Sequence, residues 1–232
     1  MKKRSKKYLK TFEKIEKGKL YSKEEAIKLA KETNVCTFDA GVEVAIRLNL
    51  DTKKADQQLR GAIVLPHGIG KVKRILVIAK GEHAKAAKEA GADFVGDVDL
   101  IEKIEKENWL GFDVLIATPE MMPALGKIGK LLGPKGLMPN PKTGTVTIDI
   151  KKAVEDVKKG RIEYRTDSFA IVHTLFGKCS FEEEKLLENL DVFIDTIIKS
   201  KPSGAKGTYI KSIVISTTMG PGIKINPNSF DK

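Results

Sequence analysis

The sequence contains few of the residues that carry redox, metal or nucleophilic chemistry. Its 232 residues include two cysteines, three histidines and one tryptophan. Cys36 and Cys179 lie far apart without a Cys-Xaa-Xaa-Cys spacing, and His67, His83 and His173 show no ligand periodicity. We therefore expect reduced cysteines, structural histidines and no bound metal.

Motifs for catalysis or for a cofactor are also missing. No serine lies in a Gly-Xaa-Ser-Xaa-Gly elbow, and neither cysteine has a recognisable nucleophile context. A Gly-Lys pair ends at Lys71, but Leu65 and Val72 stand where a Walker motif needs glycine and serine or threonine. Gly81 supplies one glycine where a dinucleotide fingerprint needs three. The sequence predicts no enzyme and no cofactor.

Long apolar runs are absent as well. No run approaches the roughly 18 residues that span a bilayer, and the first ten residues lack the apolar segment of a signal peptide. We therefore expect a cytoplasmic protein with no membrane partner. Apolar residues make up 41% of the chain, which is enough to fill a core.

Positive charge is in excess. There are 42 Lys and Arg against 31 Asp and Glu, a formal net charge of +11, and the pI is near 9.4. This balance favours a polyanionic partner, and nucleic acid more than an acidic membrane surface. The middle segment 68–159 has 16 basic and 13 acidic residues (+3), and the flanks have 26 and 18 (+8). We expect the flanks to be the principal nucleic-acid binder.

The N-terminus concentrates this charge. Six basic residues and no acidic residue lie within the first ten positions. Such an arm is usually flexible until it meets phosphate. We predict that its basic residues, Lys2, Lys3 and Arg4 among them, bind RNA.

The middle of the chain alternates strand and helix patterns. Short apolar runs of the kind buried in parallel sheets are each followed by a helix-forming segment. The expected elements are strands at 74–79, 94–95 and 112–118, helices at 82–90, 99–108 and from Pro119 toward Leu132, an edge strand at 145–150 and a helix at 151–159 that Gly160 ends. This order predicts a three-layer, Rossmann-like α/β unit.

The flanks show strands of period two and long helices. Ser22 with Glu25 forms a capping box before a helix through Glu32, and residues 42–50 alternate as a half-buried strand does. The C-terminal flank is expected to hold strands at 169–176 and 209–216, and a helix that Ser180 and Glu183 cap and that runs to about Lys199.

Neither flank closes a core alone, because each leaves an apolar face uncovered. We therefore predict an α/β protein of two domains. Residues 1–67 and 160–232 form a discontinuous two-layer α/β sandwich, and residues 68–159 form the inserted Rossmann-like domain. Small residues at the two crossings predict a hinge at Pro66, His67, Gly68, Lys159 and Gly160.

Glycine, proline and lysine alternate between Gly126 and Gly144. Glycine permits close backbone approach, proline stiffens the loop and lysine supplies charge, a combination that suits a phosphate-rich partner. A solvated connector has the same composition, so composition alone leaves both interpretations open. The candidate RNA-facing residues of this loop are Lys130, Gly133, Lys135, Gly136 and Lys142.

Within that loop, GPKGLMPNPKTGT at 133–145 resembles the signature of the family of the large-subunit ribosomal protein numbered one, in its bacterial type. Thr37-Phe38-Asp39 followed by Val42-Glu43-Val44 resembles the family's segment near the N-terminus. The segment 216–221, STTMGP, resembles its segment near the C-terminus. The likeness covers essentially the whole chain.

The resemblance implies a structural RNA-binding protein of the large ribosomal subunit. Its discontinuous domain would hold the ribosomal RNA stalk near the exit site, and its inserted domain would assist release of deacylated transfer RNA. Bacterial members also bind their own messenger RNA and repress its translation. The implied partners are these three RNAs, and the free protein is expected to be a monomer. The family's RNA contacts fall on Phe38, Glu43, Ser212, Thr218, Met219 and Gly220.

The residues themselves allow other interpretations. Phe38 is either a stacking face for RNA or a core side chain, and Thr218, Met219 and Gly220 either follow RNA hydroxyls or end a strand. The alternative function is a two-domain enzyme or binding protein that closes on a phosphate-bearing metabolite, with Lys135 and Lys142 as phosphate holders. That alternative lacks an identifiable acid, base or nucleophile.

Overall fold

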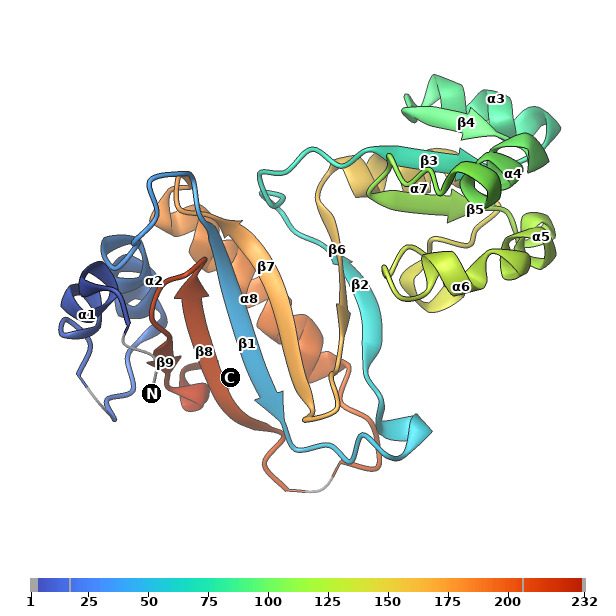
Figure 1. Ribbon diagram of the computed structural model, residues 1–232. Coiled ribbons are helices and arrows are strands. Elements are labelled where there is room, and N and C mark those ends of the chain that lie inside the picture. Colours follow the sequence, from blue (N-terminus) through green and yellow to red (C-terminus); the bar gives the residue numbers. More distant parts are fainter. Residues whose placement is uncertain (1–3, 17, 206, 231–232) are drawn as a thin grey trace. The chain divides into compact units, whose positions relative to one another are not determined.

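The computed structural model of the chain describes residues 4–16, 18–205 and 207–230. It is a mixed α/β structure in two compact units, Met1–Gly70 with Ile162–Lys232, and Lys71–Arg161 (Figure 1). The first boundary lies just beyond the predicted crossing at Pro66, His67 and Gly68, and the second just beyond Gly160. That each unit folds as an independent domain stays a prediction.

The discontinuous unit is built on a four-stranded sheet in the order β7-β1-β8-β9. Its strands are β1 (Gly41–Leu48), β7 (Ile171–Lys178), β8 (Ile210–Thr217) and β9 (Ile223–Ile225). β1 is antiparallel to both β7 and β8, and β8 is antiparallel to β9. The central strand therefore comes from the N-terminal flank, and both of its neighbours come from the C-terminal flank.

Two helices cover one face of this sheet, α2 (Lys23–Glu32) and α8 (Glu183–Lys199) (Figure 1). The predicted capping box is confirmed, since the Ser22 hydroxyl accepts from the Glu25 amide and the Glu25 carboxylate accepts from the Ser22 amide. Val42, Val44, Ile46 and Leu48 of β1 are buried against these helices, in a core that includes the following side chains of α2 and α8: Ile27, Leu190, Phe193 and Ile197. The alternation of the sequence thus fixes which face of β1 points inward.

Further elements of this unit were not predicted. β2 (Arg60–Val64) pairs with β6 (Arg161–Arg165) in a separate two-stranded sheet, and 3-10 helices span Ala55–Gln57 and Pro227–Phe230. Lys6–Phe12 of the N-terminal arm form helix α1 with Ser5 as its N-cap, an element that was not predicted; none of its residues is buried, and the flexibility of the arm stays a prediction. Ser5 accepts a hydrogen bond from the Tyr8 amide.

The contiguous unit contains a three-stranded parallel sheet in the order β4-β3-β5. β3 (Ile75–Ile78) is buried along its whole length between β4 (Phe94–Gly96) and β5 (Val114–Ala117). One face packs against α3 (Gly81–Glu89) and α7 (Ile150–Lys158). The other packs against α4 (Val98–Glu107), α5 (Met122–Lys127) and α6 (Gly129–Leu132). Because the sheet is buried on both faces, the sequences of its strands are continuous apolar runs.

Three local predictions are wrong. The helix from Pro119 toward Leu132 is broken into a 3-10 turn (Pro119–Met121), α5 and α6, because Ile128 between Gly126 and Gly129 leaves helical geometry at ψ 9°. The strand at 145–150 is reduced to one parallel bridge between Ala117 and Val146.

The third concerns the start of α8. Ser180 does not cap this helix, because its hydroxyl donates to Asp39 Oδ2 instead. Glu182 occupies the N-cap position without a side-chain capping bond.

Across residues 4–16, 18–205 and 207–230, no helix combines the length and the apolar character that crossing a membrane requires.

Candidate nucleic-acid interface

The second face of the four-stranded sheet carries polar and small side chains together with partly buried apolar ones, such as Leu175 and Val214. In β1 these are Gly41, Glu43, Ala45 and Arg47, which alternate with the buried residues. Glu43 pairs with Ser216 of β8 and Arg47 pairs with Ser212. On the other side of β1, Ala45 pairs with His173 of β7, which is exposed. Two predicted contact residues, Glu43 and Ser212, thus lie on this open face, next to Arg47 and His173, which the predictions did not include. The same alternation that predicted β1 would have identified Arg47.

The turn that follows β8 carries three more predicted residues. The Gly220 amide donates to the Thr217 carbonyl (2.8 Å), which closes a β-turn around Thr218 and Met219. Met219 has φ 63° and its side chain is 75% exposed. This left-handed position of a turn normally belongs to glycine, so an exposed methionine there stores strain, which is commonest at functional sites. A Cβ on Gly220 would overlap the Thr217 hydroxyl, so only glycine fits that position without rearrangement.

Phe38 lies beside this turn and is 56% exposed, so the alternative of a core phenylalanine is wrong. The two segments are joined directly, because the Cys36 thiol donates to the Thr218 carbonyl oxygen (3.2 Å). The Thr218 amide in turn donates to the Gly41 carbonyl at the start of β1 (2.9 Å). The structure therefore brings Phe38, Thr218 and Met219 to one end of the open sheet face.

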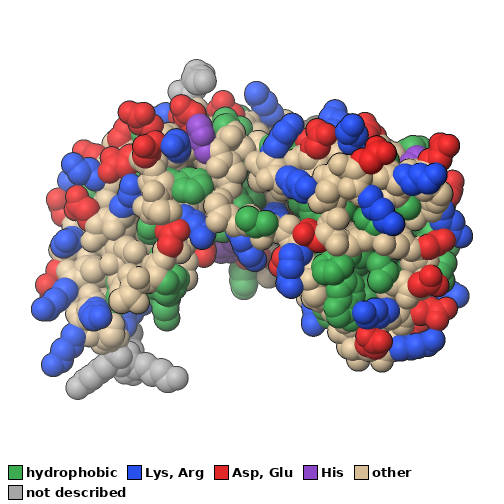
Figure 2. All heavy atoms as spheres, turned by 90° about the horizontal axis from the view of Figure 1, so that it is seen from above, with side chains coloured by type: hydrophobic (Ala, Val, Ile, Leu, Met, Phe, Trp, Pro, Cys, Tyr) green, Lys and Arg blue, Asp and Glu red, His purple; other side chains and the backbone are tan. Residues whose placement is uncertain are grey.

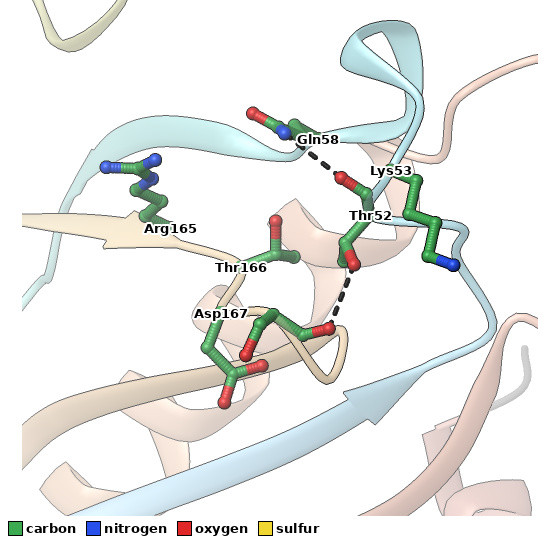
Figure 3. A pocket seen from close by; sticks show the side chains of 7 residues that line it. Thr52, Lys53, Gln58, Arg165, Thr166 and Asp167 are labelled. Atoms are coloured by element: carbon green, nitrogen blue, oxygen red, sulfur yellow. Dashed lines mark hydrogen bonds between the residues drawn. The ribbon is translucent and has the colours of Figure 1, made fainter.

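A polar pocket of about 700 Å³ lies beside the β6–β7 connection (Figure 3). The Thr52 hydroxyl donates to the Ser168 carbonyl (2.9 Å), and Gln58 donates to the Thr52 carbonyl (3.0 Å). Arg165 and Lys53 supply positive charge to its lining. Sequence analysis missed these residues, because their proximity depends on the pairing of β2 with β6.

Asp167 also lines this pocket, and its charge is stabilised locally. Backbone hydrogen bonds, first from Ile171 and then from Phe169, outweigh desolvation and lower the pKa of the Asp167 carboxyl. His173 Nε2 lies 3.6 Å from Asp167 Oδ2. The carboxylate thus fixes the turn that leads into β7, and it faces a histidine of the open sheet face.

Charge is not concentrated on one side of the surface in view. Figure 2 shows Lys and Arg side chains interspersed with Asp and Glu on that face. Long-range attraction from the net charge of +11 therefore brings a polyanion to the protein without choosing its sequence or shape. Selectivity for one RNA needs, beyond this attraction, side chains that contact bases and sugars directly.

The predicted loop residues lie in the contiguous unit. Lys130, Lys135 and Lys142 are exposed, and Gly136 has φ 71°. Gly133 packs closely, because a Cβ there would lie 2.8 Å from the Gly129 carbonyl oxygen.

The end of this loop is tied in place. The Asn140 amide donates to the Thr145 hydroxyl (2.8 Å), and the Asn140 side chain accepts from the Lys142 amide (2.8 Å). Thr143, which is fully buried, bonds to the same Thr145 hydroxyl (3.1 Å). This part of the loop is held by its own hydrogen bonds, in contrast to a loose connector.

Of the predicted N-terminal residues, Lys2 and Lys3 lie outside the described part of the chain. Arg4 is exposed, and its guanidinium carbon lies 4.4 Å from the centre of the Tyr8 ring.

The predicted hinge residues flank the unit boundaries. His67 and Gly68 are tied to the fully buried Asn189, which accepts from the His67 amide (3.1 Å) and donates to the Gly68 carbonyl (3.0 Å). Pro66 lies directly before them and is exposed. Lys159 and Gly160 end α7, with Gly160 at φ 99°. A hinge at these positions stays a prediction.

Two features of the described residues concern metal binding and cysteine reactivity. Within them, no group of three or more His, Cys, Asp or Glu side chains is placed to hold a metal ion. Burial, followed by the charge of Asp39, raises the pKa of the Cys179 thiol, which is the opposite of what activates a nucleophile.

A strongly basic α/β protein with exposed Phe38 and Met219 at one end of an open sheet face is consistent with the class of RNA-binding proteins. Comparison with known protein families agrees with this class. The model of the Ribosomal protein L1p/L10e family matches residues 15–221, and the chain belongs to this family. It is a family of structural ribosomal proteins and not of enzymes, and membership implies binding to ribosomal RNA of the large subunit.

Proposed function

We propose that the discontinuous unit holds the stalk of the large-subunit ribosomal RNA through Phe38, Glu43, Ser212, Thr218, Met219 and Gly220. The observation that carries the proposal is the pair of exposed apolar side chains, Phe38 and Met219, on segments joined by the Cys36 to Thr218 hydrogen bond. Exposed aromatic and thioether groups beside hydroxyls suit stacking on bases and contact with 2′-hydroxyls.

Lysine and arginine supply the part of the affinity that does not depend on sequence. Four basic residues of this unit are exposed and suited to this role: Arg4, Arg47, Lys53 and Arg165. We include Lys2 and Lys3 in the same role. Each phosphate contact should contribute a slope of about 0.7 to 0.9 to a log-log plot of affinity against salt.

The family resemblance extends this proposal to transfer RNA, to a hinge, to messenger RNA and to the place of the protein in the cell. The loop with Lys130, Lys135 and Lys142 faces transfer RNA and assists its release from the exit site. The hinge at the two crossings permits the movement of this loop that the release of transfer RNA requires. The same unit that binds ribosomal RNA also binds a similar fold in the protein's own messenger RNA and represses its translation, and the protein works in the cytoplasm on the ribosome.

A titration separates this proposal from the phosphate-metabolite alternative. The protein should bind a stalk fragment of ribosomal RNA more tightly than random RNA of equal length, and should show no saturable binding of free nucleotides. Phe38→Ala should lower the affinity for the stalk fragment by about 1 to 3 kcal/mol and leave random RNA unchanged. Equal losses on both RNAs would show that the interface lies elsewhere on the unit.

Messenger binding and transfer-RNA release need separate tests. Phe38→Ala should relieve repression of a reporter that carries the protein's own leader, in parallel with its loss on the stalk fragment. Lys135→Gln with Lys142→Gln should slow release of deacylated transfer RNA from ribosomes without changing stalk affinity. A repressor activity that survives Phe38→Ala would assign the messenger to another surface.

A further inference from the structure

The segment that presents Phe38 is fastened to the rest of its unit through Asp39. Asp39 Oδ1 accepts from the Ser180 amide (3.0 Å), and Oδ2 accepts from the Ser180 hydroxyl (2.9 Å). Lys178 Nζ lies 3.5 Å from the same Oδ2. These partners lie at the end of β7 and just before α8, so one carboxylate links two parts of the chain that are 141 residues apart.

Two neighbouring residues complete the attachment. The Cys36 thiol donates to the Thr218 carbonyl, and the Ala40 carbonyl accepts from the Cys179 amide (2.9 Å). Anchors therefore lie on both sides of Phe38, while its own ring remains exposed. A side chain held in its bound direction before the partner arrives loses less freedom on binding.

A carboxylate on a surface that meets RNA needs an explanation, because it repels phosphate. Both oxygens of Asp39 already accept hydrogen bonds from Ser180. Desolvation opposes ionisation, but these bonds and the charge of Lys178 outweigh it and hold the pKa of Asp39 below its usual value. Both oxygens are therefore engaged within the protein, which explains the place of this carboxylate without any contact to RNA.

We propose that Asp39 is a positioning residue for RNA recognition, which acts by fixing the direction of Phe38 through Ser180. This inference rests on the proposed role of Phe38 in RNA binding. It assigns Asp39 and Ser180 to the interface as its support, although neither needs to touch the RNA.

The sign of the effect distinguishes positioning from charge. Asp39→Ala raises the net charge by one, which by attraction alone would tighten binding to any RNA. If the ordered conformer of the segment falls to about a tenth of the population, binding of the stalk fragment should weaken about tenfold. Random RNA should bind unchanged or slightly more tightly. Asp39→Asn keeps one acceptor oxygen and should lie between Asp39→Ala and the parent.

Two further variants serve as controls. Glu182→Ala removes an exposed carboxylate close to Ser180, one that pairs with Lys185 (2.7 Å), and gives the same change of charge. It should not weaken stalk binding. Ser180→Ala leaves both oxygens of Asp39 in place but removes one of their donors, so it should weaken stalk binding about threefold. A loss with Asp39→Ala but none with Ser180→Ala would indicate that Asp39 contacts RNA directly, and would overturn the proposal.

A double-mutant cycle with Phe38→Ala completes the test. If Asp39 acts through Phe38, Asp39→Ala should cause no further loss in the Phe38→Ala background, whereas independent roles would add. Faster hydrogen exchange at the Ser180 amide in Asp39→Ala would show that the link was released in the free protein. Additive losses would refute the proposal. If Phe38→Ala itself left stalk binding intact, the interface would be misplaced, and the role of Asp39 would fail with it.

Discussion

Replacing Met219 by alanine and by glycine separates the backbone of the turn from its side chain. The residue has φ 63° and is 75% exposed, so its side chain adds little to the fold. Alanine keeps the left-handed strain of about 1 to 2 kcal/mol, whereas glycine avoids it but loses about 0.5 to 1 kcal/mol more backbone entropy on folding. The glycine variant should therefore be more stable than the alanine variant by about 0.5 to 1 kcal/mol, or roughly 1 to 4 °C in melting temperature.

Binding should respond differently, because it depends on the side chain. Both variants should lose about 1 to 3 kcal/mol of affinity for the stalk fragment, which is roughly 5- to 150-fold, and keep their affinity for random RNA. Calorimetric melting with titrations of both RNAs at one salt concentration measures the two effects. An alanine variant more stable than the glycine variant would refute the strain argument. Unchanged stalk affinity in both variants would refute the assignment of Met219 to the interface.

Three other outcomes test the fold. Asn189→Ala removes the hydrogen bonds to His67, Gly68 and Phe176 and should lower the free energy of unfolding, measured in urea, by about 3 kcal/mol. Glu188→Gln removes only the charge of an exposed carboxylate that contacts His67, and should change that free energy by less than about 1 kcal/mol. Burial raises the pKa of Tyr209 to about 12, and its hydroxyl has no hydrogen-bond partner among the residues that the structure describes. Wild-type stability should therefore decline as pH rises from about 10 toward 12, and Tyr209→Phe should make that decline smaller. A protein that joins residues 1–67 to 160–232 should fold and bind the stalk fragment. A protein that joins 1–70 to 162–232 should be more stable by about 2 kcal/mol, because it retains buried Ile69. Two unfolded products would contradict the discontinuous domain.

Local patterns predicted the elements that local chemistry determines. The capping box of α2, the alternation of β1 and the apolar run of β3 each appear where their residues indicate. Elements that depend on distant partners were missed. β2 and β6 pair with each other, although the inserted segment separates them in the sequence. β9 has only three residues, and they form a strand because β8 lies beside them.

Ser180 illustrates the same difference at the site. Its sequence context indicates a helix cap, yet its hydroxyl donates a hydrogen bond to the carboxylate of Asp39, which lies in a distant part of the sequence. The family resemblance pointed to Phe38 and Met219, but the sequence gives no signal for the left-handed backbone of Met219. That conformation arises from the turn between β8 and β9 and is set by tertiary contacts.

The pairing order of the four-stranded sheet also constrains how the protein is made. β1 leaves the ribosome early, but its partners β7 and β8 emerge only after the whole of Lys71–Arg161 has been synthesised. Until then both edges of β1 are without the strands that cover them, while the contiguous unit already has every strand of its own sheet. We expect that unit to fold first during translation. The segments bearing Phe38 and Met219 meet only when the C-terminal strands arrive, so a truncated nascent chain would lack the proposed interface. If that proposal holds, the ability to bind RNA would mark a finished polypeptide.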